Sequence, residues 1–187
     1  MHLDEPRLKP LADGELDEEA LRILESSRMR GNVFNIFRTL VHHPRLLERW
    51  MVFGSHVLGK STLPPREREM VILRIGWLCR SEYEFGQHVL IGRRAGLTDE
   101  EIRRIKDGAE AEGWSELEQA MLRAVDELHA EAFISDPTWK TLAEHLSTQQ
   151  LLDLIFAVGQ YNLVSMALNT LGVQRDEGVP GFDLESA

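Results

Sequence analysis

The sequence predicts an all-α protein organised as a single domain. Apolar residues recur at spacings of three and four along most of the chain, and several stretches carry the start signals of helices. No segment shows the strict alternation of polar and apolar residues that is typical of a strand. With 187 residues, of which 43% are hydrophobic, the chain is long enough to bury one substantial core. Two smaller domains are the less favoured arrangement.

Three capping boxes and three prolines indicate where individual helices begin. In each box a serine or threonine can accept a hydrogen bond from the first helical turn, while a glutamate or glutamine three residues later reaches back. Pro64, Pro65 and Pro137 stand where a first turn needs no amide donor. The boxes pair Thr98 with Glu101, Ser115 with Glu118, and Ser147 with Gln150.

The expected helices follow one another with short connections. We divide the chain into an N-terminal extension and helix (1–29), a helical domain (30–173) and a C-terminal tail (174–187), which Gly178, Pro180 and Gly181 predict to lie on the surface. Gly159 could interrupt the last helix. The helices are expected near 16–29, 33–42, 45–58, 65–78, 80–95, 99–107, 116–132, 137–145 and 148–171.

Charge and cysteine content exclude several classes of function. A formal charge of −10, from 31 acidic and 21 basic residues, repels phosphate backbones and anionic bilayers, so neither nucleic acid nor a membrane is an expected partner. A single cysteine can form neither an internal disulfide nor a CxxC pair. The N-terminus lacks a signal-peptide pattern, and the apolar runs MVIL and LLDLIFAVG are too short to span a bilayer. These features predict a cytoplasmic protein.

An internal repeat is indicated by a shift of 83 residues. The shift aligns LPPREREMVILRIGW (63–77) with LSTQQLLDLIFAVGQ (146–160) and predicts two related helix pairs. Two unrelated buried helices are the alternative. If the repeat holds, positions needed only for packing should be alike in both copies. The second copy is apolar where the first is polar: Glu69 falls on Leu152, Ser81 on Val164, Glu84 on Ala167 and His88 on Leu171.

The polar residues of the first copy are candidates for acid–base chemistry. Glu84 and His88 are four residues apart, which places both side chains on one face of a helix. Glu69 belongs to the preceding helix. A carboxylate beside an imidazole orients the ring and raises its basicity, so the three groups could relay protons. A solvated surface pair of Glu84 and His88 is the plain alternative. The same three residues are the only plausible metal-ligand set, although we expect no metal and no cofactor.

The stretch PPREREMVILRIGWLCRSEYEFGQHVLIGRRAGLTDEEI (64–102) resembles the carboxymuconolactone decarboxylase superfamily, which includes the alkylhydroperoxidase D-like proteins. With the flanking segments, the likeness covers roughly residues 30–173. The resemblance implies an alkylhydroperoxidase D-like helical fold that assembles as a homo-oligomer, either a trimer or a hexamer. The peroxidase branch of this superfamily carries a glutamate, a CxxC pair and a histidine.

Aligned on His88, the glutamate of the peroxidase motif corresponds to Glu69, but both cysteine positions differ. The first is Ser81 and the second is Glu84. A dithiol peroxidase needs both sulfurs, so this departure removes its disulfide step. Cys79, two residues before Ser81, could act as a nucleophile only if an external thiol resolved it, and is otherwise a small inert hydrophobe. The decarboxylase branch resembles this sequence in having a glutamate four residues before the histidine, as in EFGQH (84–88).

The leading hypothesis is therefore a cofactor-independent lyase or decarboxylase acting on a small organic acid or lactone, with His88, Glu84 and Glu69 as catalytic residues. Ser81, Arg74 and Tyr83 are candidate substrate-binding residues. Arg74 could instead pair with a glutamate or extend to solvent, and Tyr83 could simply pack against a neighbouring helix. A thiol peroxidase using Cys79 and a non-catalytic small-ligand-binding protein are the alternative functions.

Overall fold

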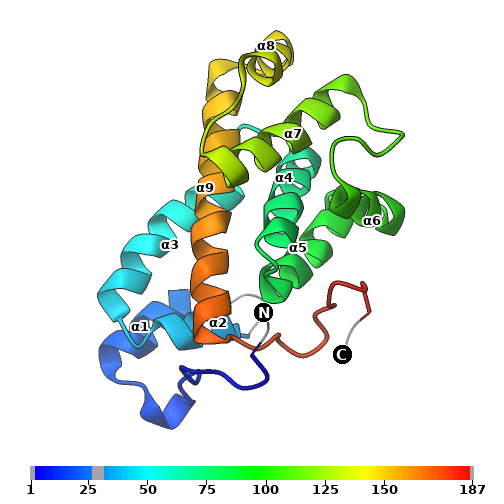
Figure 1. Cartoon of the computed structure of the whole chain (residues 1–187). Helices are drawn as coiled ribbons and strands as arrows, with labels where there is room; N and C mark the ends of the chain where they lie inside the picture. Colours follow the sequence, from blue (N-terminus) through cyan, green and yellow to red (C-terminus); the bar gives the residue numbers. More distant parts are fainter. Residues whose placement is uncertain (1–2, 27–31, 186–187) are drawn as a thin grey trace.

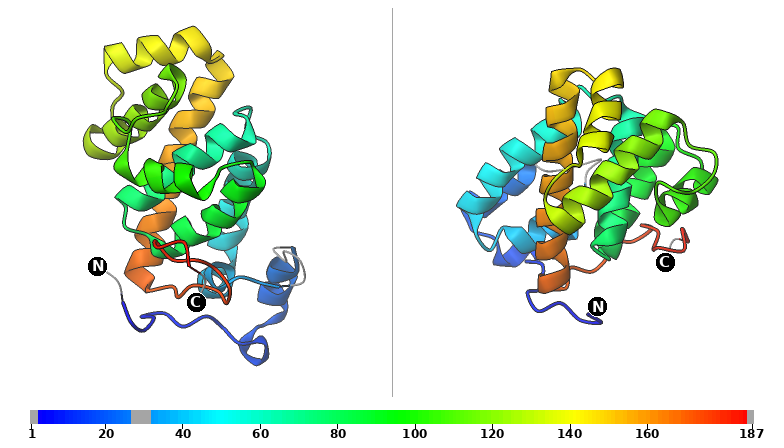
Figure 2. Two further views of the ribbon diagram at one scale, coloured as in Figure 1. Left: turned by 90° about the vertical axis from the view of Figure 1, so that its right-hand side faces the viewer. Right: turned by 45° about the horizontal axis from the view of Figure 1, so that its top comes forward.

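The computed structural model describes residues 3–26 and 32–185, and every regular element in these ranges is a helix. The longest helices stand side by side, while the first and last described segments lie toward the same end of the molecule (Figures 1 and 2). In chain order the elements are η1 (Asp13–Glu15), α1 (Glu18–Ser26), α2 (Asn35–Leu40), α3 (Pro44–Gly59), α4 (Pro65–Leu78), α5 (Glu82–Arg94), α6 (Asp99–Asp107), α7 (Glu116–Glu131), α8 (Asp136–His145) and α9 (Thr148–Leu171).

The predicted helices agree closely with the observed ones. The bounds of α4, α6 and α9 are the predicted bounds, and the other helix ends differ by at most two residues. The predicted end at 29 lies outside the described residues. The interruption expected near Gly159 is wrong, because α9 continues unbroken through that residue. One helical glycine costs only about 1 kcal/mol, which the packing of the long flanking segments outweighs.

All three capping boxes form as predicted. The Thr98 amide, for example, donates to the Glu101 carboxylate over 2.8 Å. The carboxylates of two capping boxes, Glu101 and Glu118, also form ion pairs with Arg66 at the start of α4. The first turns of α6 and α7 are thereby tied to α4.

Helix α4 lies at the centre of the molecule. Residues 69–76 are all buried, and the helix packs against α5, α6, α7 and α9. A helix that is buried on every side has no solvated stripe, which explains why its sequence is nearly continuously apolar. Glu69 and Arg74 are the exceptions, and both are paired. One core cluster joins α4 to α7, α8 and α9, and a second joins α4 to α5 and α6.

The predicted repeat of helix pairs is not found as such. After Gly76 the chain turns at 79–81 and returns as α5, whereas the equivalent stretch after Gly159 continues as α9. The two glycines also differ in environment. A Cβ on Gly76 would lie 3.6 Å from the Phe85 amide nitrogen, but one on Gly159 would meet nothing within 4 Å. Close approach of the returning helix therefore requires a small residue at Gly76 only.

The C-terminal tail is more buried than its glycines and proline suggest. It crosses α5 and carries Val179 and Leu184 into the structure at 3% and 7% exposure. A Cβ on Gly86 of α5 would stand only 2.1 Å from the Pro180 carbonyl oxygen, so the tail rests directly on the α5 backbone. The tail is drawn in red in Figure 1, where it runs from the end of α9 past the base of α4 and α5.

Candidate active site

Helices α4 and α5 bring the three predicted acid–base residues together. His88 Nδ1 lies 2.6 Å from Glu69 Oε2, and His88 Nε2 lies 2.9 Å from Glu84 Oε1. Glu69 reaches across from α4, while Glu84 precedes His88 by one turn of α5. The turn at 79–81 sets this crossing by holding the two helices in close contact beside Gly76. The solvated surface pair considered from the sequence is therefore wrong.

The cluster is almost completely withdrawn from solvent. Glu69 is 0% exposed, and Glu84 and His88 are each 4% exposed. Arg68 closes its inner end, with Nε 3.0 Å from Glu69 Oε1. If both carboxylates are ionised and His88 is protonated, the charges of these four side chains sum to zero. Such internal pairing is the condition under which buried charges are tolerated.

The two carboxylates keep a proton on the imidazole. Burial alone would lower the pKa of His88, but Glu69 and then Glu84 outweigh it and raise the pKa to about 9. The edge of the Tyr161 ring packs against the imidazole with centroids 4.7 Å apart. Burial, together with Glu84 and Glu69, holds the pKa of Tyr161 well above its ordinary value. Tyr161 is therefore a neutral wall of the cluster.

Because both ring nitrogens face carboxylates, the imidazole has no lone pair free for a metal or for direct contact with a substrate. Within the described residues, no three acidic, histidine or cysteine side chains are arranged around a metal position. What the geometry permits is proton movement along the chain of groups Glu69, His88 and Glu84.

Two buried hydroxyls, those of Ser81 and Ser165, lie near the Glu84 end of the cluster. Ser81 is the N-terminal capping residue of α5 but makes no capping hydrogen bond, and its 0% exposed hydroxyl has no partner among the described residues. Ser165 of α9 is also 0% exposed, and its hydroxyl lies beside the Cys79 thiol without reaching full hydrogen-bond geometry. Buried hydroxyls without partners are uncommon and call for an explanation.

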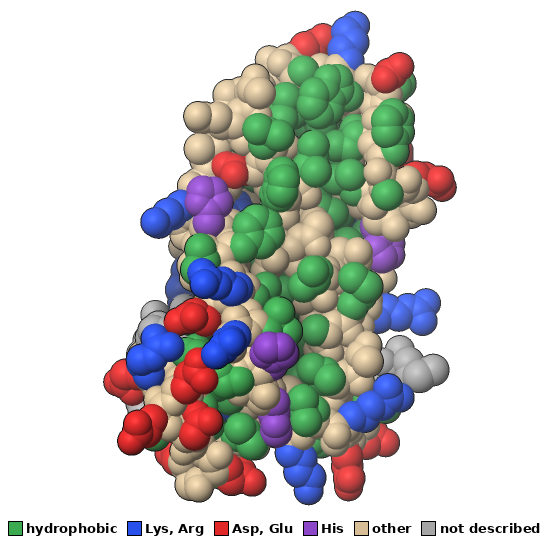
Figure 3. Space-filling view, turned by 90° about the vertical axis from the view of Figure 1, so that its left-hand side faces the viewer, with side chains coloured by type: hydrophobic (Ala, Val, Ile, Leu, Met, Phe, Trp, Pro, Cys, Tyr) green, Lys and Arg blue, Asp and Glu red, His purple; other side chains and the backbone are tan. Residues whose placement is uncertain are grey.

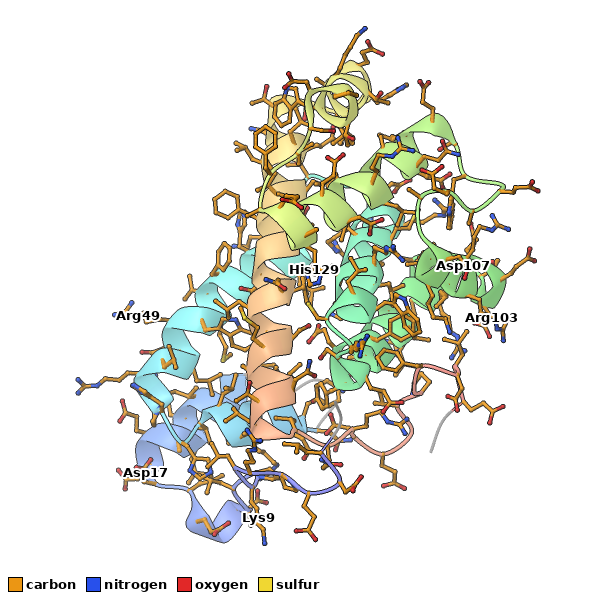
Figure 4. All side chains as sticks on the ribbon, viewed as in Figure 1. Lys9, Asp17, Arg49, Arg103, Asp107 and His129 are labelled. Carbon is orange, nitrogen blue, oxygen red and sulfur yellow. The ribbon has the colours of Figure 1, made fainter. Side chains whose placement is uncertain are left out.

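Cys79 lies at the end of α4 and is partly exposed. Its sulfur is 3.0 Å from Asn162 Oδ1 and 3.9 Å from Nδ1 of His129, a residue near the end of α7 (Figure 4). Burial raises the pKa of the thiol, Ser165 opposes that rise, and Glu84 adds to it. The thiolate is therefore scarce at neutral pH, which is the opposite of what a reactive cysteine requires.

The structure places Arg74 away from the cluster and corrects its assignment as a substrate-binding residue. Its Nε lies 2.6 Å from Asp126 Oδ1, and Nη2 lies 3.1 Å from Oδ2 of the same residue. Its Nη1 donates to the carbonyl oxygens of Ile105 and Lys106. The guanidinium thus joins α4 to α7 and to the end of α6. Pairing with an acidic residue was the alternative, although the partner is an aspartate.

Tyr83 is also structural. Its hydroxyl donates to Asp176 Oδ2 over 2.6 Å and accepts from the Ile36 amide over 3.2 Å. Asp176 additionally accepts from Gln87 and from the Asn35 amide. This network fastens the beginning of the tail to α2 and α5. With both hydrogen-bonding roles of its hydroxyl filled, Tyr83 has no group to offer a substrate.

Three site residues are not evident from the sequence. Arg68 pairs with Glu69, Tyr161 covers His88, and Ser165 stands beside Cys79. The adjacency of Arg68 to Glu69 is a weak signal, because neighbours in a helix point in different directions. Tyr161 and Ser165 belong to α9 and meet the cluster only through tertiary packing.

Comparison with known proteins finds a family model that matches the part of the chain that holds the cluster. The model of the carboxymuconolactone decarboxylase family matches residues 44–127, a range that contains Glu69, Glu84 and His88. Over these residues the chain is similar to the carboxymuconolactone decarboxylase family. A search of curated proteins finds no matching relative.

Several solved structures share the all-helical fold of this chain. An uncharacterized peroxidase-related protein from Ralstonia eutropha, with an alkylhydroperoxidase AhpD core, superposes with a TM-score of 0.78 at 20% identity over 91% of this chain and 92% of the other. A peroxidase-related protein from Silicibacter sp. TM1040 gives 0.75 at 17% identity over 93% and 91%. A variant of the debrominase Bmp8, in complex with 2,3,4-tribromopyrrole, gives 0.73 at 14% identity over 92% and 93%. At these identities the likeness concerns the fold.

Proposed function

We propose that this protein is a cofactor-independent lyase of the decarboxylase type that acts on a small organic acid or lactone. The observation that carries the proposal is the hydrogen-bonded series Glu69–His88–Glu84, buried and balanced by Arg68. It stores one proton on an imidazole whose pKa is raised to about 9, next to a carboxylate that can pass the proton on.

The roles of the three residues follow from their order. When a substrate carboxylate leaves as carbon dioxide, the carbon–carbon bond breaks and its electron pair stays on the remaining fragment. Glu84 takes the Nε2 proton of His88 and delivers it to that carbon, which leaves the imidazole neutral, while Glu69 holds the ring through Nδ1. Solvent then restores the proton. Relative to the sequence-based assignment, Glu84 takes the place of His88 as the group that meets the substrate.

One further side chain can position the substrate. The unpartnered Ser81 hydroxyl offers one donor near Glu84, at the N-terminus of α5. Arg68 engages Glu69 through Nε at the opposite end of the relay, so its part is to balance the charge of the carboxylates. The thiol peroxidase hypothesis has less support, because the Cys79 pKa is raised and its sulfur already contacts Asn162.

The test begins with a thermal-shift screen of small carboxylic acids and lactones, followed by assays of carbon dioxide release on every stabilising compound. A compound at about 100 times its dissociation constant adds about 2.7 kcal/mol to the folded state, which is readily detected. For a compound that turns over, we expect Glu84→Gln to lower kcat by about 100-fold or more. Glu67→Gln, a matched change on the more exposed side of α4, should leave kcat unchanged.

Two outcomes would contradict this proposal. Turnover by Glu84→Gln at the wild-type rate would remove Glu84 from the reaction. Saturable binding of acids or lactones with no turnover by the wild-type protein would instead indicate a small-ligand-binding protein with the same fold.

A further inference from the structure

A polar stripe interrupts the otherwise apolar helix α9. The helix is long and apolar enough to cross a membrane by length and composition alone, but half of its most apolar window is buried within the molecule. Asn162, Ser165 and Asn169 are separated by three and four positions, so they share one side of the helix. Asn162 Oδ1 lies 3.0 Å from the Cys79 sulfur, and Asn169 Nδ2 donates to the Cys79 carbonyl oxygen over 2.8 Å. The Ser165 hydroxyl lies beside the same thiol, so the stripe faces the turn between α4 and α5.

Cys79 connects the Glu84 end of the relay with the surface. Burial raises the pKa of its thiol and the charge of Glu84 adds to the rise, so the carboxylate lies close to the sulfur. Three other neighbours of Glu84 are enclosed, since His88, Tyr161 and Tyr83 are 4%, 6% and 3% exposed. Of these four neighbours, it is Cys79 that is partly exposed. A small molecule can therefore approach Glu84 from solvent beside the thiol.

The surface around this approach is polar. His129, an exposed residue near the end of α7, has its Nδ1 3.9 Å from the Cys79 sulfur, and the side chains of Asn162 and Asn169 border the same residue. The side of the molecule shown in Figure 3 differs, because apolar side chains outnumber charged ones along most of its length. A ligand that enters beside Cys79 therefore meets groups that can form hydrogen bonds with it.

Two donors without acceptors lie behind the thiol. The hydroxyls of Ser81 and Ser165 are each 0% exposed and find no hydrogen-bond partner in the described part of the chain. Tyr161 of α9 packs against His88 of α5. One turn further along α9 is Ser165 and one turn back along α5 is Glu84, because the two helices run in opposite directions (Figure 1). Both hydroxyls are therefore placed to hold an oxygen atom of a ligand beside Glu84.

The charge of the surroundings decides which kind of oxygen fits. Glu84 lies next to the two hydroxyls, and the chain as a whole carries −10, so a carboxylate held directly between them would be repelled. A carbonyl oxygen is neutral and has two lone pairs, one for each donor. We propose that the hydroxyls of Ser81 and Ser165 bind a carbonyl oxygen of the substrate, which enters beside Cys79.

This assignment rests on the proposed function and narrows its substrate class to acids and lactones in which a carbonyl group is bonded to the carbon that loses carbon dioxide. When that carbon–carbon bond breaks, its electron pair forms a carbon–carbon double bond and the carbonyl π electrons move onto oxygen, which gives an enolate. The two hydroxyls donate to the enolate oxygen as its charge develops. When Glu84 delivers its proton to the carbon, the double bond supplies the electron pair and the carbonyl group is restored.

Two small probes test whether the site recognises a carbonyl oxygen. γ-Butyrolactone and tetrahydrofuran share the same ring and differ in one carbonyl group. Methyl methanethiosulfonate reports on occupancy, because the Cys79 thiolate attacks its sulfenyl sulfur, a mixed disulfide forms and methanesulfinate leaves. At a fixed alkaline pH, we expect γ-butyrolactone to slow this modification in proportion to occupancy and tetrahydrofuran to have no effect. Intact-mass spectrometry of the full chain measures the rates.

Serine variants test the two donors separately. Ser81→Ala and Ser165→Ala should each raise the half-protecting concentration of γ-butyrolactone about 2- to 10-fold, relative to each variant's own rate without the lactone, because each removes one hydrogen bond. Both variants should fold, since neither hydroxyl has a protein partner to lose. Thr39→Val is the matched control, because it removes another 0% exposed hydroxyl without a partner, on α2, and should leave the half-protecting concentration unchanged.

Three results would overturn the proposal: no protection of Cys79 by γ-butyrolactone, equal protection by tetrahydrofuran, or equal half-protecting concentrations in the wild-type protein and both serine variants. The last result would mean that the hydroxyls hold only water. The proposed reaction fails separately. Serine-dependent protection without carbon dioxide release from any acid of this class would support the carbonyl site and contradict the decarboxylase. Turnover with an unchanged kcat/KM in both serine variants would support the decarboxylase and overturn the carbonyl site.

Discussion

The most direct test of the buried relay is the pH dependence of stability. Burial lowers the pKa of His88 while Glu69 and Glu84 raise it more strongly, to about 9 in the folded protein. In the unfolded chain the pKa of a histidine is about 6.5. Because the folded state holds the proton more tightly, the relay contributes its full stability below about pH 6.5. That contribution is lost as the pH rises through about 9.

The size of the effect follows from the two pKa values. The difference corresponds to about 3 kcal/mol of unfolding free energy between about pH 6 and about pH 9.5. Urea denaturation followed by the fluorescence of the four tryptophans measures it. Other groups also have shifted pKa values, since burial raises that of Cys79 and lowers that of Lys106. The comparison is therefore made against a variant with glutamine at positions 69, 84 and 88.

The glutamine variant keeps similar shapes and hydrogen-bonding groups but has no relay proton to lose. Between about pH 6 and about pH 9.5, we expect the unfolding free energy of the wild-type protein to fall by about 3 kcal/mol more than that of this variant. Nitrogen NMR of the imidazole should independently give a His88 pKa near 9. If both proteins lost equal stability, or if the imidazole titrated near 6.5, the reasoning about the buried relay would be refuted.

Two further predictions concern the packing around the site. Arg74→Ala should lower the unfolding free energy by about 3–5 kcal/mol, because it leaves Asp126 and two carbonyl groups without their donor. Arg123→Ala breaks an exposed pair with Glu110 and should lower the unfolding free energy by less than about 1 kcal/mol. Equal losses for the two variants in urea denaturation would contradict the structural role of Arg74. Gly86→Ala should displace the C-terminal tail, because its Cβ would stand 2.1 Å from the Pro180 carbonyl oxygen. Gly59→Ala, at the open end of α3, should leave the unfolding free energy unchanged or raise it slightly. Limited proteolysis of residues 174–185 measures release of the tail, and equal resistance in both variants would refute the contact.

The sequence predicts the helices well because their signals are local. Capping boxes such as Thr98 with Glu101 and the periodic apolar residues act within one or two turns, and the resulting bounds are nearly exact. The meeting of Glu84 and His88 is likewise local, since four residues on one helix fix it. The approach of Glu69 is not local, and its prediction depended on the comparison of the two sequence copies and on the superfamily resemblance rather than on spacing.

The errors arise where tertiary partners decide a side chain's role. Arg74 interrupts an apolar run, which suits a substrate-binding cation as well as a buried structural one, and only the position of Asp126 on α7 distinguishes the two. Tyr83 was ambiguous in the same way until Asp176 supplied its acceptor. Glycine and proline in the tail suggested a loosely placed segment, but glycine at position 86 of α5 allows the tail to pack closely.

The comparison between the two sequence copies also needs a different interpretation once burial is known. Glu69 is 0% exposed, but its counterpart Leu152 is 52% exposed. Because the two positions have different environments, the leucine in the second copy does not show which residue type packing would favour at position 69. Only Ser81 and its counterpart Val164 are buried alike. The case for function therefore depends on how the charged groups of the cluster are paired. A protein with apolar residues of similar volume in place of a buried ionic network is often as stable or more stable. Stability alone does not require Arg68, Glu69, Glu84 and His88 in one enclosed series, whereas storing and transferring a proton does.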